Sequence, residues 1–104
     1  MIVDLRTYTI VPRKMKAYLA AFETYGLPIL SRHIGEPLGY FTSDIGPLNQ
    51  VVHLWGYADL ADMEHRRAAR DADPAWADYL ARTEGLVMAQ ENRIVRPTAF
   101  SGIR

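Results

Sequence analysis

The residue of this chain best placed to do chemistry is a histidine in a strand of alternating side chains. Residues 50–57 read as a strand, and successive side chains of a strand point to opposite faces. His53 therefore shares a face with Val51, Trp55 and Tyr57. An imidazole in an apolar pocket can act as a general base near neutral pH, with its pKa set by burial and partners. We predict that His53 is the catalytic residue if the protein is an enzyme.

Other polar and aromatic side chains are expected on the same face of the sheet as His53. The predicted substrate-binding residues are Arg6, Tyr8, Tyr40, Trp55, Tyr57 and Asn92. A guanidinium can hold an anionic group through two parallel hydrogen bonds, and the tyrosines can donate hydrogen bonds or stack. The alternative is structural: His53 is a buried, hydrogen-bonded residue and Arg6 pairs with Glu91 or Asp4, because buried polar groups must find partners.

The remaining candidates for chemistry are weaker. His33 follows a predicted helix, where a cation suits the negative end of the helix dipole. His65 lies in the charged run 64–67, which is typical of a solvated helix face. The chain has no cysteine, and no spacing of His, Asp and Glu matches a metal-binding template. We therefore expect no metal site and no cofactor.

The N-terminal third of the chain reads as a strand followed by a helix. Residues 2–11 are rich in β-branched and aromatic residues, as strands prefer. From Arg13 onward the apolar residues recur at helical spacing, through Met15, Tyr18, Leu19 and Phe22. The run Gly26-Leu27-Pro28 then either ends this helix near Tyr25 or kinks it. The persisting apolar positions favour a kinked helix that continues toward His33.

The rest of the chain predicts a hairpin, two helices and a last strand. Strands over 38–45 and 50–57 flank the turn signal Gly46-Pro47. Helix starts are indicated by Asp59 and by Asp73-Pro74, with the first of these helices running to Arg70. The polarity of a last strand over 87–96 suggests an edge, a bulge or burial against something polar. The order β-α-β-β-α-(α)-β is that of a ferredoxin-like α+β sandwich with a four-stranded antiparallel sheet.

The two faces of this sheet predict a partner. If the aliphatic sides of the strands pack against the helices, the open side carries Tyr8, Tyr40, Trp55 and Tyr57. This apolar patch is larger than monomers usually expose. We therefore expect a homodimer in which two sheets face each other and form a dimeric α/β barrel with a closed interior.

Length and charge bound the class of protein. The 104 residues make one domain, 1–104, and twelve basic residues balance twelve acidic ones. A nucleic-acid binder normally gathers a basic excess on one face, so this balance argues against nucleic acid. No segment approaches ~20 consecutive apolar residues, and the first residues lack the apolar run of a signal peptide. We expect a cytoplasmic protein that does not enter a membrane.

Several stretches carry a resemblance to a known family. They are Leu5-Arg6-Thr7-Tyr8-Thr9, Gly39-Tyr40-Phe41-Thr42, the segment 45–55, Asp73-Pro74-Ala75-Trp76 and Gln90-Glu91-Asn92-Arg93-Ile94. Together they resemble the NIPSNAP family over almost the whole chain. The resemblance implies a ferredoxin-like domain that dimerises through its sheet, in a superfamily that includes cofactor-independent monooxygenases and haem-degrading enzymes. It implies no settled reaction.

Two functions remain open on the sequence alone. The first is a small-molecule binding protein or enzyme that uses the barrel interior. Its most concrete form is a cofactor-independent monooxygenase, in which His53 or a tyrosine removes a proton from an electron-rich aromatic substrate. The second is a non-catalytic dimeric module that acts through protein contacts. A cavity of ~300 Å³ or more lined by His53 and Arg6 would favour the first.

Overall fold

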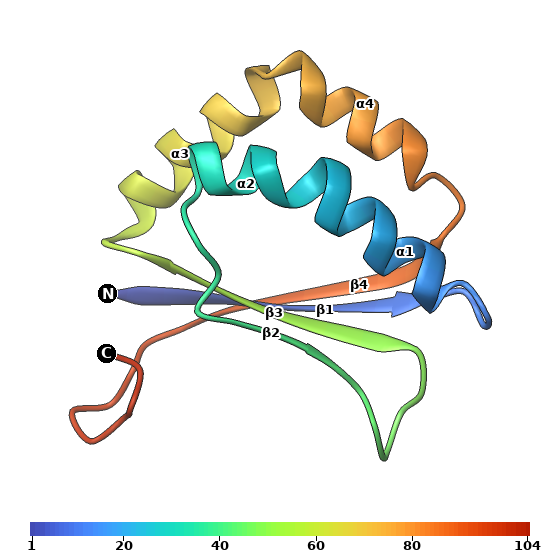
Figure 1. Ribbon diagram of the computed structural model, residues 1–104. Coiled ribbons are helices and arrows are strands. Elements are labelled where there is room, and N and C mark those ends of the chain that lie inside the picture. The colour runs from blue at the N-terminus through green and yellow to red at the C-terminus, as the bar shows by residue number, and fades with distance from the viewer.

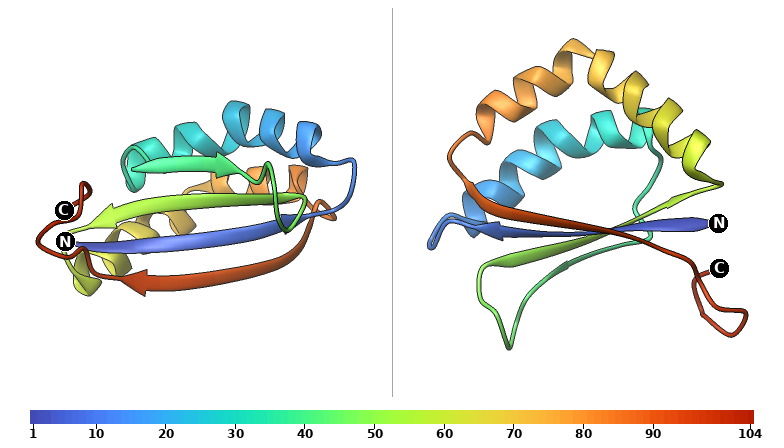
Figure 2. Two further views of the ribbon diagram at one scale, coloured as in Figure 1. Left: turned by 90° about the horizontal axis from the view of Figure 1, so that it is seen from below. Right: turned by 180° about the vertical axis from the view of Figure 1, so that it is seen from behind.

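Four strands form one antiparallel sheet in a computed structural model that describes residues 1–104 (Figure 1). The strands are β1 (Ile2–Ile10), β2 (Gly39–Thr42), β3 (Gln50–Tyr57) and β4 (Val87–Val95). Their order across the sheet is β2-β3-β1-β4. All helices lie on one face of this sheet, as both views in Figure 2 show. The predicted ferredoxin-like α+β fold is confirmed.

The first helical segment continues through the Gly26-Leu27-Pro28 run, as predicted. It comprises α1 (Met15–Ala21), a π-helical turn η1 (Phe22–Gly26) and α2 (Leu27–His33). In this wide turn the N–H of Leu27 donates to the carbonyl of Phe22, five residues back. The wide turn lies immediately before Pro28, which has no N–H to donate.

The predicted starts of the next two helices are also confirmed. In α3 (Leu60–Ala72), Asp59 Oδ1 accepts a hydrogen bond of 2.8 Å from the N–H of Asp62. In α4 (Pro74–Arg82), Asp73 Oδ1 accepts one of 3.0 Å from the N–H of Ala75. Each aspartate supplies an acceptor to an otherwise unpaired first-turn N–H.

The hairpin differs from the prediction in the length of its first strand. Strand pairing ends at Thr42 opposite Val51, so β2 is shorter than the predicted 38–45. The chain then forms a wide loop in which Gly46 and Asn49 both have positive φ. Glycine and asparagine tolerate this backbone region better than other residues. This loop takes the place of the tight turn predicted at Gly46-Pro47.

The predicted orientation of the sheet is wrong. The side chains of Tyr8, Tyr40, Trp55 and Tyr57 face the helices, and His53 is only 3% exposed. The helix layer is itself aromatic, and the Phe22 ring lies 5.5 Å from the imidazole of His53. Burying large aromatic rings against each other removes more apolar surface from water than burying valine and leucine. The aliphatic side, with Val52 and Leu54, is the open one.

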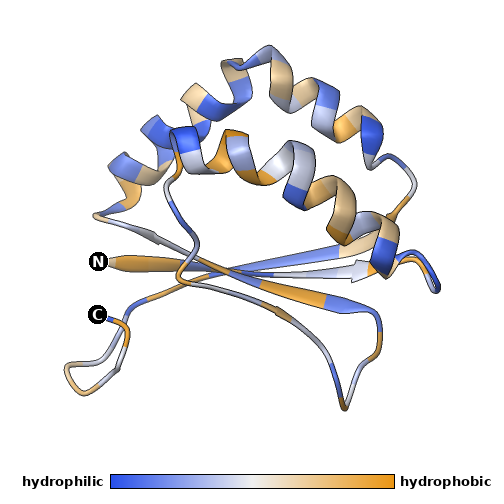
Figure 3. Ribbon diagram, viewed as in Figure 1, coloured by the Kyte–Doolittle hydropathy of each residue, from blue (hydrophilic) through white to orange (hydrophobic).

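The edge strand β4 is exposed along its whole length, which fits the predicted edge. Its central residues are hydrophilic, whereas apolar segments run through the middle of the sheet (Figure 3). The helices therefore leave one edge of the sheet uncovered.

Candidate functional site

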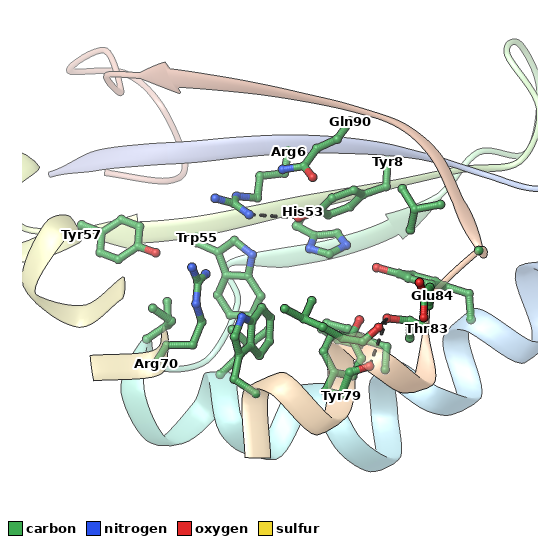
Figure 4. Close-up of a pocket in the computed structure, with 18 residues that line it drawn as sticks. Arg6, Tyr8, His53, Trp55, Tyr57, Arg70, Tyr79, Thr83, Glu84 and Gln90 are labelled. Atoms are coloured by element: carbon green, nitrogen blue, oxygen red, sulfur yellow. Dashed lines mark hydrogen bonds between the residues drawn. The ribbon is translucent and has the colours of Figure 1, made fainter. Parts of the chain in front are cut away.

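A cavity of about 350 Å³ lies between the sheet and the helix layer (Figure 4). The strands contribute Arg6, Tyr8, His53, Trp55 and Tyr57 to its lining. The helices and the segment leading into β4 contribute Phe22, Arg70, Trp76, Tyr79, Leu80, Thr83 and Glu84, among others. The volume falls in the range of small-molecule sites, which are concave and mostly apolar.

Two of the predicted site residues lie outside this cavity. The ring of Tyr40 lies tilted against the imidazole of His53, with the ring centroids 4.0 Å apart, and it also contacts the ring of Phe22. Asn92 is exposed on β4, directly opposite Arg6 in the strand pairing. With its amide oxygen turned toward Arg6, it accepts a hydrogen bond of 3.0 Å from Nη2. Both residues therefore contact lining residues from outside the cavity.

The sequence reasoning missed the contribution of the helices. Trp76 and Tyr79, on α4, both line the cavity and were not among the predicted site residues. Arg70, predicted only as the end of a helix, also lines the cavity and is 9% exposed. It follows Met63 by seven residues, so the helical period already places Arg70 on the buried face of α3.

Arg6 is held in place by a buried ion pair. Its Nε donates to Asp4 Oδ2 at 2.8 Å, and its Nη1 donates to the hydroxyl of Tyr8 at 2.9 Å. Burial alone would lower the pKa of Arg6, but Tyr8 and Asp4 raise it, so the guanidinium stays charged. The predicted alternative in which Arg6 pairs with Asp4 is therefore confirmed. Glu91, the other predicted partner, accepts a hydrogen bond from Arg93 instead.

The imidazole of His53 is neutral in the cavity. Burial and the neighbouring Arg6 charge lower its pKa to about 3. Its Nε2 atom is buried and has no hydrogen-bond partner, so the alternative of a fully hydrogen-bonded structural histidine is not what the structure shows. A base works best when its pKa is near the operating pH. This imidazole is therefore better suited to hydrogen bonding than to proton abstraction.

The buried tyrosines in and around the cavity are also unsuited to proton abstraction, because their pKa values lie far above neutral pH. Burial raises the pKa values of Tyr18, Tyr40 and Tyr79. All three phenols remain protonated at neutral pH and can act only as hydrogen-bond donors or neutral acceptors.

The sheet order and the single helix layer define a ferredoxin-like α+β protein. The chain belongs to the NIPSNAP family, whose model matches residues 3–102. A NipSnap homologue of Dictyostelium discoideum is 33% identical over 90% of this chain and 41% of its own length. Human NipSnap homologue 2 is 33% identical over 99% of this chain and 35% of its own length. The chain thus spans less than half of these curated relatives.

Solved structures show the same fold. A NIPSNAP family protein of unknown function from Agrobacterium tumefaciens has a TM-score of 0.96 at 39% identity, covering 100% of this chain and 94% of that one. A second Agrobacterium NIPSNAP protein reaches 0.95 at 43% identity, covering 99% and 98%. A putative antibiotic biosynthesis monooxygenase from Nitrosomonas europaea reaches 0.68 at 14% identity, covering 93% and 98%. At that identity the likeness concerns the fold alone. None of the helices is long and apolar enough to cross a membrane.

Proposed function

We propose that this protein binds a small organic molecule in the cavity between the sheet and the helices. The observation that carries the proposal is an aromatic cavity of about 350 Å³ lined by both His53 and Arg6. The site lies within one protomer and not between two sheets.

A cofactor-independent monooxygenase is the most concrete enzymatic form of this proposal. In that form His53 accepts a proton from an electron-rich aromatic substrate, which then reacts with oxygen. The pKa of about 3 counts against this step, although an anionic substrate that offsets the Arg6 charge would raise the pKa. We therefore propose ligand binding as the function of the cavity in preference to monooxygenase catalysis.

We further propose that the protein is a homodimer in which the open sheet face is the interface. Val52 and Leu54 lie on this face and are half-buried, and Phe41 beside them is exposed. A second copy would remove these apolar side chains from water. The alternative, a non-catalytic module that acts through protein contacts, would use the same face for another partner. The expected cytoplasmic location also stays a prediction.

A pair of matched variants tests the cavity proposal. Leu80 lines the cavity and is 50% exposed, whereas Leu60 lies outside it and is 51% exposed. Leu80→Trp should fill the entrance, and Leu60→Trp adds the same bulk elsewhere. The measurement is the Tm of each protein with a panel of one- and two-ring aromatic acids, phenols and amides.

The cavity proposal predicts that some compounds raise the Tm of the wild type and of Leu60→Trp but not that of Leu80→Trp. A ligand at 100 times its Kd adds about 2.7 kcal/mol, which is a shift of several degrees for a domain of this size. Shifts that persist unchanged in Leu80→Trp would place the binding elsewhere and contradict the proposal.

A further inference from the structure

A second buried arginine approaches Arg6 at one end of the cavity. Arg70, on α3, is 9% exposed, and Arg6, on β1, is 8% exposed. Both line the cavity, and their guanidinium groups lie at the end next to Tyr57 and Trp55 (Figure 4). Two cations buried this deeply are costly unless their charge is compensated.

The guanidinium of Arg70 is fixed in direction by two neighbours. It lies over the ring of Trp76, with the central carbon 4.7 Å from the ring centroid. Its Nε and Nη2 atoms both donate to Asp71 Oδ1, at 2.9 and 2.8 Å. An arginine has five N–H donors, so Asp71 leaves others available on the cavity side.

Two carboxylates lie near this end of the cavity, and each pairs with one of the arginines. Asp4 is engaged by Arg6, and the Asp71 side chain is 59% exposed, so water screens its charge. Glu84 is the carboxylate that lines the cavity, and it lies at the opposite end beside Thr83 (Figure 4). The two arginines therefore lie at one end of the cavity and its lining carboxylate lies at the other.

The hydroxyl of Tyr57 belongs to the same end of the cavity. It points toward Trp55 and Arg70 (Figure 4). Burial and the charge of Asp4 raise the pKa of Tyr57, whereas the charges of Arg6, Arg67 and Arg70 lower it. A protonated phenol can donate its O–H to an anion held by the arginines.

The middle of the cavity is apolar and aromatic. Trp55 forms part of the sheet side of the cavity. Trp76 and Tyr79 form the helix side, and the centroids of these two rings lie 5.1 Å apart. Flat apolar groups bind well between such rings. The cavity therefore combines a cationic end with an aromatic body.

We propose that Arg6, Arg70 and Tyr57 form an anion site and that the ligand is a carboxylate with an aromatic body. This inference rests on the proposed binding function of the cavity. A carboxylate matches the planar fork of a guanidinium. As a single charge it also costs less to bury than a doubly charged phosphate.

Matched pairs of probes test this assignment. Benzoate and 2-naphthoate are compared with benzamide and 2-naphthamide, which keep the same ring and lose the charge. Affinities are measured by isothermal titration calorimetry for the wild type, Arg70→Gln, Arg70→Lys and Arg82→Gln. Arg82 pairs with Asp78 on the surface, so Arg82→Gln removes one positive charge away from the cavity. The two tryptophans both line the cavity, so the NMR signals of their indole N–H groups report the place of binding.

We expect each carboxylate to bind ~10- to ~100-fold more tightly than its amide, since charge-assisted hydrogen bonds are the strong ones. Arg70→Gln should remove most of that preference, Arg70→Lys should keep part of it, and Arg82→Gln should keep it all. Equal affinity for acids and amides, with both indole signals shifted, would overturn the anion site and leave the cavity function standing. If no probe binds at millimolar concentration, both proposals fail.

Discussion

His53 is a buried imidazole with an unpartnered Nε2, and this single residue connects the stability of the protein to its site. A core histidine whose ring nitrogens are all hydrogen-bonded would be explained by packing alone. An unsatisfied one costs stability in the empty protein.

The low pKa of His53 predicts how stability depends on pH. The unfolded chain takes up a proton at this histidine near pH 6.5, but the folded protein does so only near pH 3. The wild type should therefore lose stability as the pH falls below 6.5, by about 2 kcal/mol between pH 7 and pH 5 from this residue. Urea unfolding of the wild type and of His53→Gln at both pH values measures the difference. An equal loss in both proteins would contradict the assignment.

Trp55 contributes both to the core and to the cavity wall, and it is buried. Trp55→Ala should reduce the free energy of unfolding by ~3–5 kcal/mol, as for other large core residues. Trp55→Phe, which keeps an aromatic ring, should cost less. Urea unfolding followed by circular dichroism measures both. A loss below this range for the alanine variant would show that the indole mainly borders empty space.

At the scale of elements, the π-helical turn η1 allows α4 to approach closely. A Cβ atom at Gly26 would lie only 2.7 Å from Cε1 of Tyr79. Tyr79 is itself buried and cannot swing away into water. The absence of a side chain at residue 26 therefore fixes the ring of Tyr79 in the wall of the cavity.

Gly26→Ala should destabilise the protein although alanine is the better helix former. Overpacking costs ~1–3 kcal/mol, and the propensity gain returns ~0.5–1 kcal/mol. The net loss of free energy of unfolding should be seen in urea unfolding. The exposed Gly102 has open space around it, so Gly102→Ala is the control. A more stable Gly26→Ala protein would mean that Tyr79 is free to move.

The helix starts, the kinked helix and the order of elements along the chain could all be predicted because they depend on local signals. Asp59 and Asp73 cap their helices through bonds within a few residues, and the stripe from Met15 to Phe22 has one clear period. The orientation of the sheet could not be predicted in the same way. Both faces of β3 are apolar, so the period of two identifies the faces but not which one the helices cover.

The cavity residues were only partly predictable for a related reason. Arg6, Tyr8, His53, Trp55 and Tyr57 share one sheet face, and the alternation identifies that set whichever way the face points. The helix residues Arg70 and Trp76 join the site only through tertiary packing. No spacing within the sequence connects α3 or α4 to β1.

At the scale of the molecule, one face of the sheet has no cover, and this predicts the oligomeric state. The wild type should elute with twice the mass of one chain in size-exclusion chromatography with light scattering. Leu54→Glu places a charge in the middle of the open face and should yield a monomer. Leu60→Glu, on the exposed side of α3, should stay dimeric. A monomeric wild type at micromolar concentration would refute the dimer but not the cavity.

The central claim is that a ligand lies between the sheet and the helices of one protomer. A crystal structure of the complex with the most tightly bound aromatic carboxylate tests it most directly. We predict ligand density between Trp55, Trp76 and Tyr79, with its carboxylate at Arg6 and Arg70. Density between the open sheet faces of two copies, or a cavity filled by the protein's own side chains, would contradict the account.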